Sequence, residues 1–215
     1  MMRNNKIRIF CDVDDTLWDL LPYWINYNNV EYMSYYPDTP QCEYLSTDLN
    51  EYTSWDMSDK FSNDIYREKF YSFLSHDELW DTIYVPDKRI ITLKKINELE
   101  YVDLYIVTSM KPEHSYKLKK FKKVFPFIKD KQIITCHDKW LLNGDIWIDD
   151  KPETLDKCRK CAGGRTIKIN KPYNKFIHSD LVINDFSELY DNEEFNQILK
   201  EVYNIKNESR VQYVY

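Results

Sequence analysis

The 215-residue sequence predicts an α/β fold built on a doubly wound parallel sheet. From Pro86 onward helical and strand patterns alternate, which is typical of a parallel sheet covered by helices on both faces. An alternating, β-prone segment predicts a first strand over residues 6–11. Between these parts, residues 17–85 form a long aromatic and acidic region with helical spacing. The chain is therefore predicted to be one sheet domain with a sizeable insertion.

The individual elements are predicted from the spacing of apolar residues and from capping residues. In the inserted region, helices are predicted over 20–36 and 58–74, with Ser58 or Asp59 as the N-cap of the second helix. After this region the predicted order is helix 86–99, strand 102–109, helix 111–125, strand 131–136, strand 144–150, helix 151–161, strand 163–170, strand 180–185 and helix 186–203.

Composition excludes several classes of protein. Hydrophobic residues make up 43% of the chain, enough for a core, yet no run approaches the about 18 consecutive apolar residues of a membrane span. The first ten residues lack the apolar segment of a signal peptide, so a cytoplasmic location is expected. The five cysteines do not suggest a disulfide framework, and Cys158 and Cys161 are interpreted as two thiols on one helix rather than a metal site.

The distribution of charge argues against a nucleic-acid partner. The net charge is −6, and residues 19–64 carry nine acidic side chains and one basic side chain. Residues 151–175 carry eight basic side chains and two acidic ones. The basic run over 117–123 is interpreted as a solvated helix face. We therefore expect no stable nucleic-acid partner and no membrane partner.

Side chains capable of chemistry gather at the predicted carboxyl ends of the strands, where ligands bind in parallel α/β sheets. Four carboxylates lie within residues 12–19, and like charges held this close repel one another unless they are solvated or bind a cation. Further polar groups follow three later strands. The residues concerned are Asp12 and Asp14 after the first strand, then Thr108 and Ser109, then Lys139, and then Asp149 and Asp150.

This combination of groups suits phosphoryl transfer. Mg²⁺ prefers oxygen ligands and needs only a few protein carboxylates. One carboxylate can attack the phosphorus, and a second can protonate the leaving oxygen and then activate water. A hydroxyl, backbone N–H groups and an ammonium can bind the remaining phosphoryl oxygens. The bound cation would also explain how the acidic cluster is tolerated.

These motifs resemble those of the haloacid-dehalogenase-like phosphatase superfamily, which has a Rossmann-like sheet. The segment DVDDT at residues 12–16 matches that superfamily's first motif, DxDxT, and the other three motifs follow in the family's order. Receiver domains of two-component systems use similar residues but place the acidic pair first, whereas here the second acidic pair comes last. The resemblance implies that Asp12 is the nucleophile and Asp14 the acid/base.

The remaining roles also follow from the resemblance. Thr108, Ser109 and Lys139 would bind the phosphate. Mg²⁺ would be held by Asp12, by the backbone carbonyl of Asp14 and by Asp149, with Asp150 as a second ligand or an outer partner.

Within the superfamily the sequence is most similar to the small 5'(3')-deoxyribonucleotidases, in the segments TSMKPEHSYKLKKF and IITCHDKWLLNGDIWIDDKPETL. That group inserts a small helical cap after the first motif. The resemblance therefore implies a cap at residues 17–85 and a core of residues 1–16 and 86–215. Two departures are Asp15 with Thr16, where the group often has Gly and Val, and His137, where it often has Arg.

A nucleotide base needs a flat apolar wall, and aromatic residues of the cap could supply it. Such residues belong more often to a core than to a binding site, but stacking on a base is worth about 1–3 kcal/mol. Trp18, Trp55 and Trp80 are the candidates, and Trp18 is favoured because it adjoins the first motif.

The predicted function is a Mg²⁺-dependent phosphomonoesterase that acts on (deoxy)nucleoside monophosphates through an aspartyl-phosphate. The expected partner is this small-molecule substrate, and a homodimer is left open. The alternatives are a polynucleotide 3'-phosphatase, another small-metabolite phosphatase of the same superfamily, and a non-catalytic phosphate-sensing module. The acidic cap argues against a long polyanion as substrate.

Overall fold

The computed structural model describes residues 6–35, 38, 40–110 and 115–211. Six parallel strands form one sheet in the order β3-β2-β1-β4-β5-β6. The chain moves outward in one direction from β1 to β3 and in the other from β4 to β6, so the predicted doubly wound α/β fold is confirmed. The strands are β1 (Ile7–Cys11), β2 (Val102–Thr108), β3 (Ile133–Thr135), β4 (Ile146–Asp149), β5 (Arg165–Ile169) and β6 (Leu181–Ile183).

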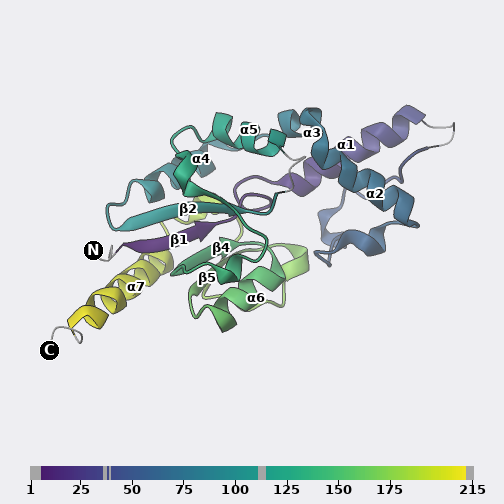
Figure 1. Cartoon of the computed structure of the whole chain (residues 1–215). Coiled ribbons are helices and arrows are strands. Elements are labelled where there is room, and N and C mark those ends of the chain that lie inside the picture. Colours follow the sequence, from purple (N-terminus) through teal and green to yellow (C-terminus); the bar gives the residue numbers. More distant parts are fainter. Residues whose placement is uncertain (1–5, 36–37, 39, 111–114, 212–215) are drawn as a thin grey trace.

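Seven α-helices accompany the sheet within the described residues (Figure 1). None of the helices in this part of the chain is long and apolar enough to cross a membrane. The first four residues of the helix predicted over 111–125 lie outside the described residues. The helices are α1 (Leu20–Tyr35), α2 (Asp64–Ser72), α3 (Asp77–Thr82), α4 (Asp87–Asn97), α5 (Ser115–Val124), α6 (Pro152–Cys161) and α7 (Glu193–Val211).

Alternating residues of the strands separate the core into two parts, because successive side chains point to opposite faces of a sheet. Ile9 of β1 belongs to the larger part, which also takes in α4, α5 and α7. Its neighbour Phe10 belongs to a smaller part with Trp147 of β4 and Cys158 of α6. Both faces of the sheet are therefore covered, as a parallel sheet requires.

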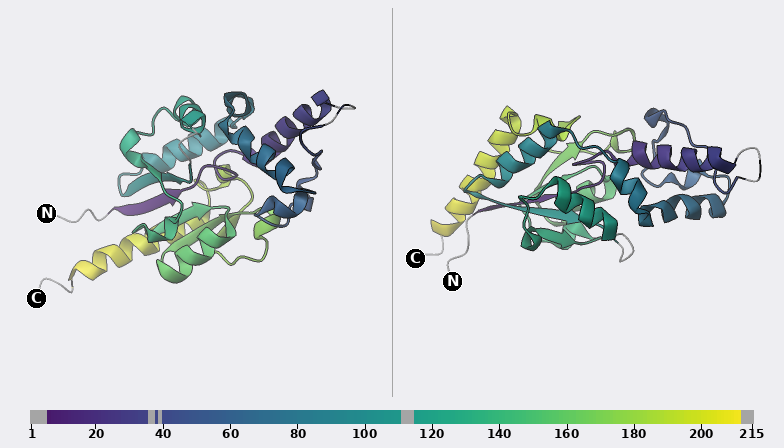
Figure 2. Two further views of the ribbon diagram at one scale, coloured as in Figure 1. Left: turned by 45° about the vertical axis from the view of Figure 1, so that its right-hand side comes forward. Right: turned by 90° about the horizontal axis from the view of Figure 1, so that it is seen from above.

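Helices α1, α2 and α3 lie together beyond the carboxyl end of β1 (Figures 1 and 2), and the described residues between the start of α1 and the end of α3 add no strand to the sheet. Trp24 of α1 stacks on Phe70 of α2 with ring centroids 4.0 Å apart, and its indole N–H donates to the Phe70 carbonyl at 2.8 Å. The buried Asn29 of α1 holds the following loop by two hydrogen bonds to the backbone of Leu45. The helices thus pack on one another, and their buried side chains are continuous with the larger part of the sheet's core.

Two predicted helix starts are wrong. The helix predicted from residue 58 begins at Asp64, and its N-cap is Asn63, whose side chain accepts a hydrogen bond from the backbone N–H of Tyr66. Ser58 and Asp59 instead lie in a short 3₁₀ helix, because Asp56 caps that turn. The helix predicted from residue 186 starts as a 3₁₀ turn over Phe186–Glu188, and α7 begins only at Glu193. In both places a local cap offers the backbone an alternative to a continuous helix.

We expect Gly164→Ala to destabilise the protein by about 1–3 kcal/mol, because overpacking a core displaces well-packed side chains. A Cβ at this position would lie 1.8 Å from Cζ3 of the buried Trp147. Gly163→Ala is the matched control: a Cβ there meets nothing within 4 Å, but its φ of +65° should cost about 1 kcal/mol. Urea unfolding measures both, and a Gly164→Ala midpoint equal to that of the wild type would contradict the packing argument.

Candidate active site

The register of the sheet brings two of the predicted carboxylates together. Cys11 of β1 pairs with Ile148 of β4, so Asp12 and Asp149 lie side by side at adjacent strand ends. The backbone N–H of Asp12 donates to the Ile148 carbonyl at 2.9 Å and continues the ladder by one residue. The parallel pairing itself therefore creates the acidic pair.

Beyond Asp12 the chain makes a tight turn. The backbone N–H of Leu17 donates to the carbonyl of Val13 at 2.9 Å. Asp15 has a φ of 52°, in the left-handed region that favours glycine, and its carboxylate accepts a hydrogen bond from the Leu21 N–H at 3.2 Å. Burial raises the pKa of Asp15 to about 7, although the nearby Lys171 opposes this shift.

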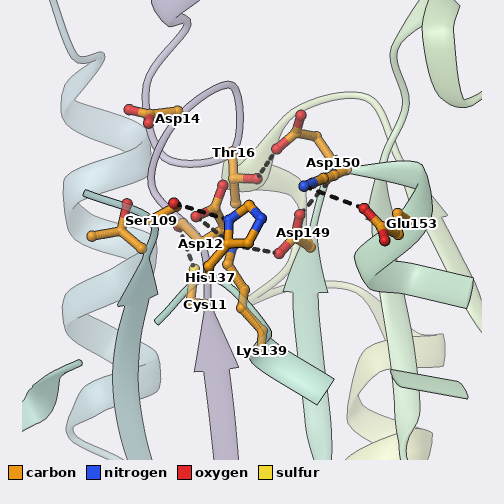
Figure 3. A network of polar contacts seen from close by, with 12 residues as sticks. Cys11, Asp12, Asp14, Thr16, Ser109, His137, Lys139, Asp149, Asp150 and Glu153 are labelled. Carbon is orange, nitrogen blue, oxygen red and sulfur yellow. Dashed lines mark hydrogen bonds and ion pairs between the residues drawn. The ribbon is translucent and has the colours of Figure 1, made fainter. Parts of the chain in front are cut away.

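A buried ammonium joins the two adjacent carboxylates (Figure 3). Lys139 Nζ lies 2.6 Å from Asp12 Oδ1 and 2.7 Å from Asp149 Oδ2, and all three side chains are at most 10% exposed. Burial alone would lower the pKa of Lys139, but Asp12 and Asp149 outweigh burial and raise it. No donor within the described residues contacts Asp12 Oδ2. One oxygen of Asp12 is therefore held in place while the other stays available.

Asp150 is held by groups from two other parts of the chain. The Thr16 hydroxyl donates to Asp150 Oδ1 at 3.0 Å, and the Tyr173 hydroxyl donates to Oδ2 at 2.6 Å (Figure 3 shows the Thr16 contact). The side-chain amide of Asn174 donates to the Asp150 backbone carbonyl at 2.7 Å. These contacts fix both the carboxylate and its backbone.

The acidic cluster fits a divalent cation. Asp12, Asp149 and Asp150 each offer a carboxylate oxygen, and these atoms lie within 4.8 Å of one another. Three carboxylates against the one ammonium of Lys139 leave two excess negative charges. Burial raises the pKa of Asp149 to about 6 and also raises that of Asp150, and the neighbouring carboxylates add to both shifts. A buried set of hard oxygens that lacks positive charge is what Mg²⁺ binds.

The second carboxylate of the loop, Asp14, has different partners. Lys117 Nζ forms an ion pair with Asp14 Oδ2, and the Trp18 indole N–H donates to Asp14 Oδ1 at 3.0 Å. The same ammonium donates to Thr108 Oγ1 at 2.6 Å and to the Ser109 carbonyl at 3.3 Å. Lys117 therefore ties Asp14 to the end of β2, where the predicted phosphate-binding hydroxyls lie.

The interpretation of residues 117–123 as a solvated helix face is wrong at Lys117, which is 2% exposed. Lys117 and Phe121 lie one turn apart on the buried face of α5. The sequence does contain a signal for this placement, because Lys117 is in helical register with the apolar Phe121 and Phe125. A lysine within such a stripe indicates a buried cation. Tyr173 and Asn174, by contrast, follow β5 with no motif to mark them.

A cavity of about 310 Å³ connects these polar groups with an aromatic wall. Trp55 and Trp80 line the cavity, together with Trp24 and Tyr71. The Lys151 ammonium, which also lines it, lies 4.1 Å from the ring centroid of Trp55. The polar lining residues are Asp12, Asp14, Asp15, Ser54, Ser109, Lys117, His137, Lys139, Asp150, Lys151, Thr154 and Tyr173.

Trp18 does not line this cavity, which corrects the expectation that it contacts the base. Its side chain is 0% exposed and packs against Trp80 and Phe121, with ring centroids 6.1 Å apart in each pair. The turn after β1 points the indole into the core, and only its N–H reaches the site, at Asp14. His137, at the position where the resembling group has Arg, does line the cavity and contacts the Ser109 hydroxyl at 3.3 Å.

The family is decided by a match over most of the chain. The family model described as "5' nucleotidase, deoxy (Pyrimidine), cytosolic type C protein" matches residues 5–195. The chain belongs to this family. The predictions of a haloacid-dehalogenase-like phosphatase and of a phosphoric monoester hydrolase are thereby confirmed for this member of the cytosolic type C nucleotidase family.

Curated relatives agree with this assignment at low sequence identity. A 5'(3')-deoxyribonucleotidase of Bacillus subtilis is 25% identical over 169 residues, which cover 78% of this chain and 87% of the relative. A 5'(3')-deoxyribonucleotidase of Clostridium acetobutylicum is 27% identical over 181 residues, covering 81% of this chain and 90% of the relative.

Solved structures share the fold. A HAD hydrolase of family IA from Entamoeba histolytica has a TM-score of 0.59 and 15% identity, and the match covers 90% of this chain and 99% of that one. A putative HAD-hydrolase from Bacillus subtilis, bound to magnesium, has a TM-score of 0.55 and 18% identity, with 86% and 97% covered. At these identities the likeness supports the architecture alone.

We expect Lys139→Met to destabilise the metal-free nucleotidase by about 3 kcal/mol, because the change leaves Asp12 and Asp149 buried without their cation. Adding Asp149→Asn removes one of the repelling charges and should recover part of the loss. Lys131→Met, on the exposed surface, is the control and should change stability by less than about 0.5 kcal/mol. Urea unfolding with chelator present measures all three. Equal stability of the single and double variants would contradict this electrostatic argument.

Proposed function

We propose that the protein is a Mg²⁺-dependent phosphomonoesterase that hydrolyses (deoxy)nucleoside monophosphates through an aspartyl-phosphate on Asp12. The observation that carries this proposal is the carboxylate of Asp12, which Lys139 contacts at one oxygen only. This carboxylate lies in the acidic cluster and lines a cavity with an aromatic wall. Membership of the nucleotidase family and the names of the curated relatives support the choice of substrate.

In this proposal Mg²⁺ is held by the side chains of Asp12, Asp149 and Asp150 and by the backbone carbonyl of Asp14. When bound, the ion would polarise a phosphoryl oxygen and offset the excess negative charge of the cluster. Thr16 and Tyr173 orient Asp150 for this task by donating to its two oxygens.

The first step is an in-line attack of Asp12 Oδ2 on the phosphorus. The bond from Asp12 to phosphorus forms as the bond from phosphorus to the ribose oxygen breaks, and protonated Asp14 gives its proton to that oxygen. Thr108, Ser109 and Lys139 bind the phosphoryl oxygens during the transfer. The nucleoside then leaves the cavity.

The second step regenerates the enzyme. A water molecule attacks the phosphorus of the aspartyl-phosphate and loses a proton to Asp14, now a carboxylate. The bond between Asp12 and phosphorus breaks, which releases inorganic phosphate and restores the free Asp12 carboxylate. Each turnover therefore consumes one water and leaves Asp14 protonated for the next substrate.

We further propose that residues 17–85 act as a cap on a core formed by residues 1–16 and 86–215. Helices α1 to α3 lie beyond the carboxyl end of β1 (Figure 2). The segment that contains them supplies most of the aromatic residues that line the cavity. Trp55 and Trp80 would contact the base by stacking. The small-molecule substrate and a cytoplasmic location belong to the same proposal.

Metal removal and loss of the nucleophile should both abolish turnover. Chelation of divalent cations should stop phosphate release from a deoxynucleoside monophosphate, and added Mg²⁺ should restore it. Asp12→Asn should lower kcat by at least about 1,000-fold, because an amide cannot form the aspartyl-phosphate. Phosphate release is measured for both, with Asp77→Asn on the exposed face of α3 as the control. Undiminished turnover in chelator would falsify the metal requirement.

Substrate size separates the proposed function from that of a polynucleotide 3'-phosphatase. A cavity of about 310 Å³ suits one nucleotide. The acidic cap should also repel a longer polyanion. We expect kcat/KM for a deoxynucleoside monophosphate to exceed that for a 3'-phosphorylated oligonucleotide by about 100-fold. A preference for the oligonucleotide, measured at matched ionic strength, would favour the polynucleotide phosphatase instead.

A further inference from the structure

The side chain of Asp14 depends on two donors that reach it from different parts of the protein. The Lys117 ammonium pairs with Oδ2, and the Trp18 indole N–H donates to Oδ1. Among the described residues, these two groups are the hydrogen-bond donors to the Asp14 carboxyl group. The group is 30% exposed, so water competes for it. One donor would leave the carboxyl plane free to turn about the Lys117 contact, whereas two donors, one at each oxygen, fix it.

The indole is itself held rigidly. Trp18 is fully buried, and its ring packs edge-on against Phe121 of α5 and at a tilt against Trp80 of α3. Phe121 lies one helical turn from Lys117 on the same buried face of α5. The helix that supplies the ammonium for Oδ2 therefore also supports the ring that supplies the N–H for Oδ1.

We propose that Trp18 is a positioning residue for Asp14, and that its N–H sets the carboxyl plane so that the proton reaches the leaving oxygen. This inference rests on the proposed function, in which Asp14 protonates the ribose oxygen as Asp12 binds the phosphorus. It adds a role that neither the DxDxT motif nor the aromatic wall assigns, since Trp18 touches neither the metal-binding side chains nor the cavity.

The test removes the N–H and keeps the ring. Trp18→Phe keeps an aromatic side chain, and replacement of Trp18 by benzothienylalanine, in which sulfur takes the place of the N–H, keeps the shape of the indole. The second variant decides the question if the first folds poorly. Trp147→Phe is the matched control, because Trp147 is also buried but its indole N–H has no partner in the described structure.

The experiment compares how much each variant slows two substrates that differ in their leaving group. Release of nucleoside from a deoxynucleoside monophosphate needs a proton on the ribose oxygen. Release of p-nitrophenolate from p-nitrophenyl phosphate needs none. We expect the single-turnover rate of nucleoside release to fall about 10-fold without the N–H, because the Asp14 proton is then less often directed at the ribose oxygen, while p-nitrophenol release changes by less than about 2-fold. The Mg²⁺ concentration for half-maximal activity should stay unchanged.

A double variant separates positioning from a general structural effect. If Trp18 acts through Asp14, its replacement in an Asp14→Asn background should cost nothing further on nucleotide substrate. Equal losses for both leaving groups, or losses that add to that of Asp14→Asn, would overturn the inference. Full activity of Asp14→Asn would instead overturn the proposed function, and the inference with it. An inactive Asp14→Asn beside a fully active Trp18 variant would overturn the inference alone.

Discussion

The site depends on like charge that the parallel register forces together. Because Cys11 pairs with Ile148, Asp12 and Asp149 leave adjacent strands as neighbours, in a place where neither carboxylate is well solvated. A buried carboxylate without a partner costs several kcal/mol, so the fold needs a cation at this point. Lys139 supplies one positive charge between them. The charge that stays uncompensated is why the cluster fits a divalent cation, as proposed, rather than a closed salt bridge.

The sequence predicted the parts of the site that follow from strand ends. Asp12, Thr108 and Asp149 each end or directly follow a strand, and carboxyl ends of parallel strands meet at one edge, so periodicity alone brings them together. The motifs that contain these residues also follow one another along the chain in the order typical of the superfamily, and this order made the resemblance recognisable. The doubly wound parallel sheet was predicted without side-chain detail, because alternating helices and strands leave few other arrangements.

The rest of the site depends on contacts between distant segments, which periodicity does not encode. Trp18 adjoins the first motif in sequence, but its ring packs against Phe121 and Trp80 in the core. Lys117 sits in a basic run that resembles a solvated helix face, and only its alignment with Phe121 marks it as buried. The start of α2 was misplaced for a local reason: Asp56 caps a separate 3₁₀ turn that contains Ser58 and Asp59, and Asn63 then caps α2.

Two carboxylates of one loop receive opposite surroundings, and this difference suits them to different tasks. Asp12 is 10% exposed and held at one oxygen by Lys139, whereas Asp14 is 30% exposed and held at both oxygens by Lys117 and Trp18. A nucleophile needs a free oxygen, and an acid needs a fixed direction, so each arrangement matches its proposed role. The fixed direction in turn depends on aromatic packing that continues to the cavity wall. Trp80 therefore belongs both to the proposed wall for the base and to the packing that supports the indole beside Asp14.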